Sequence, residues 1–296
     1  MDIVLHLWGL DGKPSVVSPE SVALFWLLNE LDLKSRITVV FSNNTDLSPT
    51  QELPLLVNGV SRLSGFANIA SFFCAPKSAL ETALLQFAQD HIGALTQYQL
   101  YLNRNNYDQF TRKVFAYLLQ WPMWYNTPLT NRSLARKRCE ALGYFGHADD
   151  EDHFEFDAEQ IDELVQSKAF KLTKASKARK EDLLKSARFN LQYMNRLGDQ
   201  IKCWLEAREK LEPQPVLASD YLVWANLFVQ LELPDGNLVR EHLQRTLGKD
   251  KYEVLAANLE NCSQSTSRLY QRGPTFEERG NVVMSAYQAM CRLVAL

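Results

Sequence analysis

The residues of this chain that could do chemistry are its five cysteines and five histidines, which could act as thiolate nucleophiles or as metal ligands. The cysteines are dispersed, without a CxxC pair, at Cys74, Cys139, Cys203, Cys262 and Cys291. The histidines show no HxxxH or mixed Cys/His spacing and lie at His6, His91, His147, His153 and His242. An odd, scattered set of cysteines indicates free thiols in a reducing compartment, and an isolated histidine is more often a packed or surface residue than a ligand. We therefore expect no metal site.

Composition and charge exclude further classes of function. Apolar residues make up 46% and charged residues 23% of the 296 positions, as in a soluble globular chain of about two domains. The net charge of -3 argues against a general nucleic-acid-binding protein. The sequence has no Walker loop and no GxGxxG motif, and its acidic stretch lacks the DxDxDG spacing of a calcium loop.

The first elements that could position a ligand follow a strand, helix, strand order. An apolar strand covers Ile3–Trp8, and a β-branched strand covers Arg36–Ser42. Between them, Ser18 is suited to cap a helix that has Pro19 at its first position. This spacing predicts a right-handed βαβ crossover with parallel strands.

A second unit lies in the stretch "LPLLVNGVSRLSGFANIASFF", Leu53–Phe73. Two short strands flank Asn58-Gly59, the pair favoured at the centre of a type I′ hairpin, and Ser64 could cap the helix that follows. The order βαβ then ββα is that of a thioredoxin-like domain, which we place at residues 1–75. Helical periodicity dominates residues 76–296, so the predicted fold is α+β followed by all-α, as in glutathione S-transferases.

The thiol-binding groups of that fold are doubtful in this chain. Pro54 stands where thioredoxin-like proteins place a cis-proline, although that turn could shape the domain without any ligand. Glutathione S-transferases open the following helix with an acidic residue or Gln and then Ser, whereas here these positions are Gly65 and Phe66. The loop after the first strand offers only Ser15 and Ser18 in place of an activating residue. We therefore expect no bound cofactor and no catalysis.

A helix corner with the sequence "WPMWYNTPL" is the first candidate for binding another protein. It brings together Trp121, Trp124 and Tyr125, and clustered aromatic residues dominate interface energetics when they are exposed. The same residues could instead form a buried corner of the helical domain.

A charged insert at about residues 147–180 is the second candidate. Its first part is acidic, and its second part is a basic run formed by Lys168, Lys171, Lys174, Lys177, Arg179 and Lys180. The basic run could meet an anionic membrane surface or a partner. It could equally be a solvated segment that balances its acidic neighbour, since blocks of like charge usually stay solvated or disordered.

Membrane and targeting segments are not evident. The start "MDIVLHLWG" lacks the features of a secretory signal or a transit peptide. The most apolar stretch, "NVVMSAYQAMCRLVAL", is short and contains Gln288 and Arg292, so we interpret it as an amphipathic core-facing helix.

Several longer motifs give the chain a family resemblance: "LHLWGLDGKPS", "VFSNNTDLS", "LPLLVNG", "SGFANI", "WPMWYNTPL", "LPDGN" and "RGNVVMSAY". Together they resemble the fungal thirty-seven-kilodalton metaxin-like subunits of the mitochondrial sorting and assembly machinery. The resemblance runs from the first strand to the last helix and is interrupted around the charged insert.

The resemblance implies a non-enzymatic, peripheral protein on the cytosolic face of the mitochondrial outer membrane. Its implied partners are a β-barrel insertase subunit, a second metaxin-like subunit, the outer-membrane translocase and β-barrel precursors. Two alternatives stay open: a glutathione-dependent transferase, and a binding module of a translation or signalling complex in the cytosol.

Overall fold

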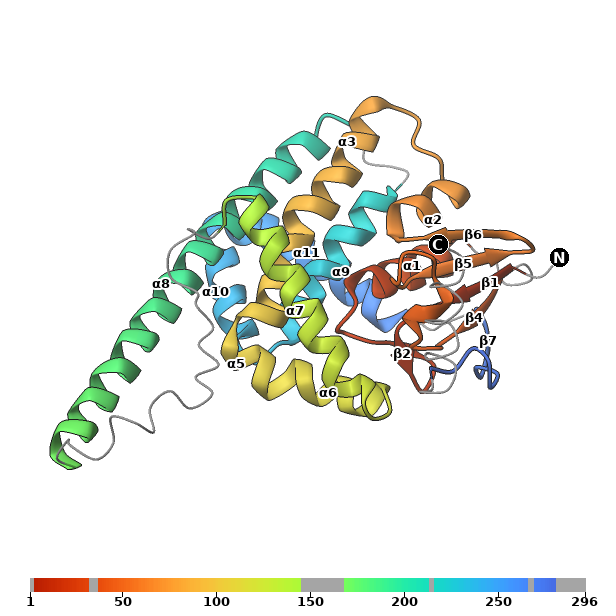
Figure 1. Ribbon diagram of the computed structural model, residues 1–296. Helices are drawn as coiled ribbons and strands as arrows, with labels where there is room; N and C mark the ends of the chain where they lie inside the picture. Colours follow the sequence, from red (N-terminus) through yellow and green to blue (C-terminus); the bar gives the residue numbers. More distant parts are fainter. Residues whose placement is uncertain (1–2, 32–36, 145–167, 213–215, 266–268, 281–296) are drawn as a thin grey trace.

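A mixed sheet with two helices begins the computed structural model, and a larger helical region follows it (Figure 1). This arrangement confirms the predicted glutathione S-transferase-like fold class. The structure describes residues 3–31, 37–144, 168–212, 216–265 and 269–280, with side chains from residue 184 onward in the helix that begins at 168.

The main sheet has five strands in the order β6-β5-β1-β4-β7. These strands are β1 (Ile3–His6), β4 (Ile37–Val40), β5 (Leu55–Asn58), β6 (Ser61–Ser64) and β7 (Tyr270–Arg272). β1 runs parallel to β4, as the βαβ spacing predicts, and antiparallel to β5. β7 adds to the outer edge of β4 in parallel, so the chain returns to the N-terminal sheet after the helical region. This strand was not among the elements expected from the sequence.

Two helices connect and cover the strands: α1 (Pro19–Glu30) and α2 (Phe66–Phe73). α1 is buried on nearly every side because it lies between the sheet and α9 (Ala218–Glu232). Trp26 of α1 packs edge-to-face on Phe228 of α9, with ring centroids 5.4 Å apart. The sheet and the helical region therefore share one continuous hydrophobic core.

The helical region begins with two successive helices that meet at a bend at Asn103. The first runs through α3 (Ala79–Phe87) and α4 (Gly93–Gln97), and the second through α5 (Arg104–Asn106) and α6 (Arg112–Leu118), with π-helical turns at Ala88–Ile92, Tyr98–Leu102 and Tyr107–Thr111. The others are α7 (Met123–Ala141), α8 (Lys168–Arg208), α10 (Gly236–Leu247) and α11 (Lys249–Gln264). A two-stranded hairpin, β2 (Gly9–Leu10) with β3 (Lys13–Pro14), and a 3-10 turn at Thr45–Leu47 complete the elements.

The bend between these two helices has a local cause at Asn103. Its side-chain oxygen accepts hydrogen bonds from the backbone N–H groups of Asn105 and Asn106, at 3.1 and 3.4 Å, so it caps a new helix start. Its amide nitrogen donates to Asp235 at 2.8 Å and ties the bend to the start of α10. The bend determines where α6 ends and therefore where the corner after it lies.

Two local predictions were wrong. The hairpin loop is Gly59-Val60, because Asn58 pairs with Ser61 and only Gly59 has a positive φ, of 60°. Ser64 lies in β6 and does not cap α2, whose N-cap is Gly65. At the start of α9, the Asp220 carboxylate acts as the cap and accepts the Leu217 N–H at 2.8 Å.

The basic run is helical, against the expectation of an irregular charged insert. Lys168–Lys180 forms the first part of α8, in agreement with the high helix propensity of Lys, Arg, Ala and Leu. The acidic part of the insert and the apolar C-terminal stretch lie outside the described residues. Within the described part of the chain, no helix has the length and apolar character needed to cross a bilayer.

Candidate partner-binding surface

The position that would hold a thiol ligand is built from Pro54 and the start of α2. The Leu53–Pro54 peptide bond is cis, in agreement with the position expected for this fold. Gly65 precedes α2 with a φ of 81°, a backbone conformation that favours glycine. Phe66 begins α2 and is fully buried in the main hydrophobic core. These two positions therefore offer backbone and an enclosed ring, and no polar side chain for a ligand.

A carboxylate from α1 already occupies the N-terminus of α2. Glu20 Oε2 accepts a hydrogen bond from the Phe66 backbone N–H at 3.1 Å, where an anionic ligand group would otherwise find its donor. Burial raises the pKa of Glu20, and the bond from Phe66 opposes that change. The sequence did not identify this contact, because the two residues are 46 positions apart.

The two serine hydroxyls of the first loop accept hydrogen bonds from backbone N–H groups two and three residues away. Ser18 caps α1, as predicted, and accepts from the Ser21 N–H at 3.3 Å. The Ser15 hydroxyl accepts from the Val17 N–H at 3.4 Å. Both hydroxyls are buried and engaged locally, so neither faces a substrate position.

Burial changes the protonation of two of the candidate thiols and of one candidate imidazole. Burial raises the pKa of Cys139 to about 12 and that of Cys262 to about 11, so both are protonated thiols at neutral pH. Burial lowers the pKa of His6 to about 4, against the opposing charge of Glu278. Over the described ranges, no group of three or more His, Cys, Asp or Glu side chains could hold a metal ion.

The corner between α6 and α7 presents several aromatic side chains to solvent. Trp121 is 74% exposed, Tyr125 is 45% exposed, and Tyr117, at the end of α6, is 78% exposed. Trp124 is partly buried, and its ring meets Tyr125 edge-to-face at 6.1 Å. We call Tyr117, Trp121, Trp124 and Tyr125 the aromatic corner. The sequence pointed to three of its members but could not decide whether they were buried, and it did not identify Tyr117.

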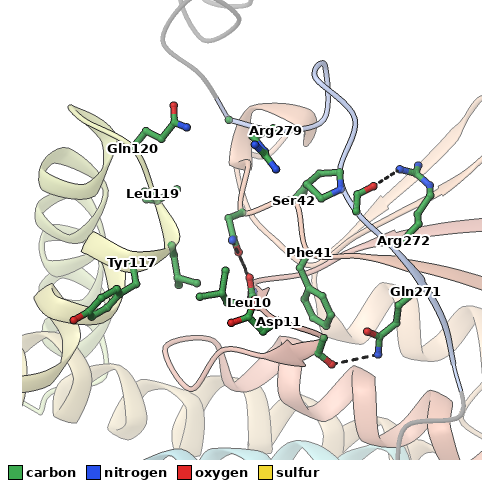
Figure 2. Close-up of a pocket in the computed structure, with 17 residues that line it drawn as sticks. Leu10, Asp11, Phe41, Ser42, Tyr117, Leu119, Gln120, Gln271, Arg272 and Arg279 are labelled. Carbon is green, nitrogen blue, oxygen red and sulfur yellow. Dashed lines mark hydrogen bonds between the residues drawn. The ribbon is translucent and has the colours of Figure 1, made fainter.

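A cavity of about 500 Å³ lies beside the aromatic corner. One wall is the end of α6, with Tyr117, Leu119 and Gln120, and the other comes from the carboxyl ends of β4 and β7 (Figure 2). The loop at Leu10 forms part of the floor and contributes an exposed leucine. The cavity therefore separates the helical corner from the sheet and has a mixed apolar and polar lining.

Two side-chain amides hold the sheet side of this cavity. Asn43 donates to the Gly9 carbonyl at 2.9 Å and accepts from the Gly9 N–H at 2.8 Å, so it binds the loop as a neighbouring strand would. A side chain at Gly9 would meet the Phe41 ring at 2.2 Å, which explains the glycine there. Gln271 of β7 donates to the Gly12 carbonyl at 3.2 Å and links the returning chain to the same loop.

Arg272, which lines the cavity, forms an ion pair with Glu278. Arg272 donates two hydrogen bonds to Glu278, at 2.5 and 2.6 Å, and this bidentate pairing, helped by the Thr275 N–H, lowers the pKa of Glu278 to about 2. The Ser42 hydroxyl is buried on the cavity lining without a hydrogen-bond partner among the described residues. Among these described groups, none forms a nucleophile and base pair.

The predicted basic run does not lie at this cavity. It belongs to α8, and none of the side chains that the structure describes in this helix lines the cavity. The aromatic corner and the basic run are therefore two separate surfaces.

Comparison with known families gives two matches that together cover most of the chain. A family described as "Outer mitochondrial membrane transport complex protein", Tom37, matches residues 21–132. The "Tom37 C-terminal domain" family matches residues 147–293. No curated protein shows a significant match to the chain.

Proposed function

Because the chain belongs to the Tom37 family of outer mitochondrial membrane transport complex proteins, we propose that it is a non-enzymatic subunit of the sorting and assembly machinery. In this role it attaches peripherally to the cytosolic face and supports the insertion, folding and release of β-barrel precursors. Its partners are then a β-barrel insertase subunit and a second metaxin-like subunit, with the outer-membrane translocase as a further candidate.

The observation that supports this proposal is the aromatic corner beside the cavity. Trp121 and Tyr117 expose most of their surface, and large exposed aromatic residues are the typical anchors of protein interfaces. The adjoining cavity is wide enough to accept a side chain of a partner. At the thiol position, by contrast, Phe66 is buried and the α2 N-terminus is bonded to Glu20.

Purification of the tagged chain from detergent-solubilised outer membranes tests this proposal. We expect a β-barrel membrane protein and a second metaxin-like protein to copurify in stable proportion. A Tyr117→Ala, Trp121→Ala double variant should lose them while keeping the melting temperature of the parent chain. Recovery of the chain alone, or with ribosomes or tRNA synthetases, would contradict the proposal.

A further inference from the structure

The first part of α8 extends away from the rest of the molecule (Figure 1). The helix has 41 residues and is therefore about 60 Å long. Five consecutive residues, 184–188, are all exposed, and five residues make more than one full helical turn. At this level no described element covers any side of the helix. Contact with the helical body begins at Phe189, which packs against the main core.

Two leucines on this exposed turn and just after it lie on one face. Leu184 is 70% exposed and Leu191 is 61% exposed, and a separation of seven residues places them on the same side of an α-helix. Tyr193 and Leu197 of the same helix are buried against the body. The leucines therefore lie on a side of the helix that is distinct from the side packed on the protein, and the exposed Arg188 lies between them.

The charge of the extending part is strongly positive. Residues 168–188 contain eight basic residues, of which six are lysines, and only two acidic residues, Glu181 and Asp182. Lysines and leucines combined on one helix are typical of helices that lie in a membrane interface, with apolar residues in the lipid and long basic side chains at the headgroups.

The abundance of lysine favours lipid over a protein partner. Lysine is depleted in protein interfaces, where arginine is enriched because its planar fork forms bidentate bonds. Clusters of four to eight basic residues on an amphipathic helix are a recurrent means of binding anionic lipid headgroups. We propose that the first part of α8, residues 168–191, lies on the anionic phospholipid surface of the membrane, with Leu184 and Leu191 inserted among the headgroups. The proposal rests on the outer-membrane location of the family and goes beyond the subunit contacts proposed above.

Flotation of the purified full-length chain with vesicles tests this inference. The probes are phosphatidylcholine vesicles with and without phosphatidylinositol, at low and high salt. We expect binding only to the anionic vesicles, weakened by salt because exposed charges are screened. Changing Lys171, Lys174, Lys177 and Lys180 to Gln should reduce the partition coefficient by about 100- to 1000-fold, because each basic residue near the surface contributes a several-fold effect.

Two matched controls distinguish lipid binding through α8 from the effects of net charge and of exposed apolar residues elsewhere. A variant with Lys77, Lys113, Lys210 and Lys249 changed to Gln has the same net charge and should bind within about threefold of the parent. Leu184→Gln with Leu191→Gln should weaken binding by about tenfold or more, whereas Leu238→Gln with Val254→Gln, at two other exposed apolar positions, should not.

The outcomes decide between lipid and protein. Equal flotation of the α8 charge variant and its control would overturn the inference. Absence of vesicle binding, together with loss of an acidic protein partner from the charge variant in membrane extracts, would assign this helix to protein recognition instead. The vesicles contain no protein, so failure here leaves the copurification test of the subunit role unaffected.

Discussion

Substitution of Trp121 by alanine separates partner binding from folding at the aromatic corner. Rings of this size bury about 150–250 Å² in an interface. With 74% of the side chain exposed in the free chain, docking could cover about 110–185 Å². At about 25 cal/mol per Å² this corresponds to about 3–4.5 kcal/mol, from which side-chain ordering removes about 1 kcal/mol. We expect a loss of about 2–3.5 kcal/mol, or about 30- to 400-fold in Kd.

The assay is a titration of the labelled chain against the detergent-solubilised outer-membrane complex, with stability followed by chemical unfolding. The free energy of unfolding should change by less than about 0.5 kcal/mol, because little of the Trp121 ring is buried in the fold. Phe115→Ala is the matched control, since Phe115 lies in α6 two residues before Tyr117, is buried, and packs on Trp8 with ring centroids 5.7 Å apart. That change should cost about 3–5 kcal/mol of folding stability.

Two results would refute this reasoning, one for partner binding and one for folding stability. A binding change below about threefold for Trp121→Ala would show that the corner is not the docking surface. A loss of more than about 2 kcal/mol in the free energy of unfolding for the same variant would show that Trp121 packs in the core of the fold.

Three further predictions concern folding stability. Glu278→Gln should destabilise the fold by about 1–2 kcal/mol at pH 7, measured by urea unfolding. Since the folded pKa of Glu278, about 2, lies below the unfolded value, this difference should shrink as pH falls from 4.5 toward 2; a difference that does not depend on pH would contradict the ion pair with Arg272. Gly9→Ala should cost about 2 kcal/mol or more in thermal unfolding, because its Cβ would lie 2.3 Å from a backbone carbonyl oxygen. Asp220→Ala should cost about 3–5 kcal/mol, since it removes a helix cap and leaves the partly buried Arg208 without its carboxylate; a neutral result would refute that pairing.

Elements with a strong local pattern were predictable from the sequence. The βαβ unit, the hairpin and the Ser18 cap depend on residues within a few positions of one another, and the structure confirms them. The hairpin loop was misplaced by one residue because Asn58-Gly59 and Gly59-Val60 both place glycine at a position that tolerates positive φ.

Features that depend on distant contacts could not be predicted. β7 has only three residues, which is too short for an alternating pattern to indicate a strand. It pairs with β4, more than 230 positions earlier in the chain. The α2 N-terminus is bonded to Glu20 of another helix, which no local capping motif reveals. Exposure of the aromatic corner follows from where the bend at Asn103 directs α6, and periodicity alone does not determine it.

The most direct measurement of the proposed role is site-specific photo-crosslinking in isolated mitochondria. A photoreactive amino acid in place of Trp121 should give an adduct with an integral β-barrel protein of the outer membrane. The same probe at Val254, an exposed apolar residue of α11, serves as the matched position and should give none. Adducts from position 121 only with soluble proteins, or equal adducts from both positions, would contradict docking of this chain through its aromatic corner.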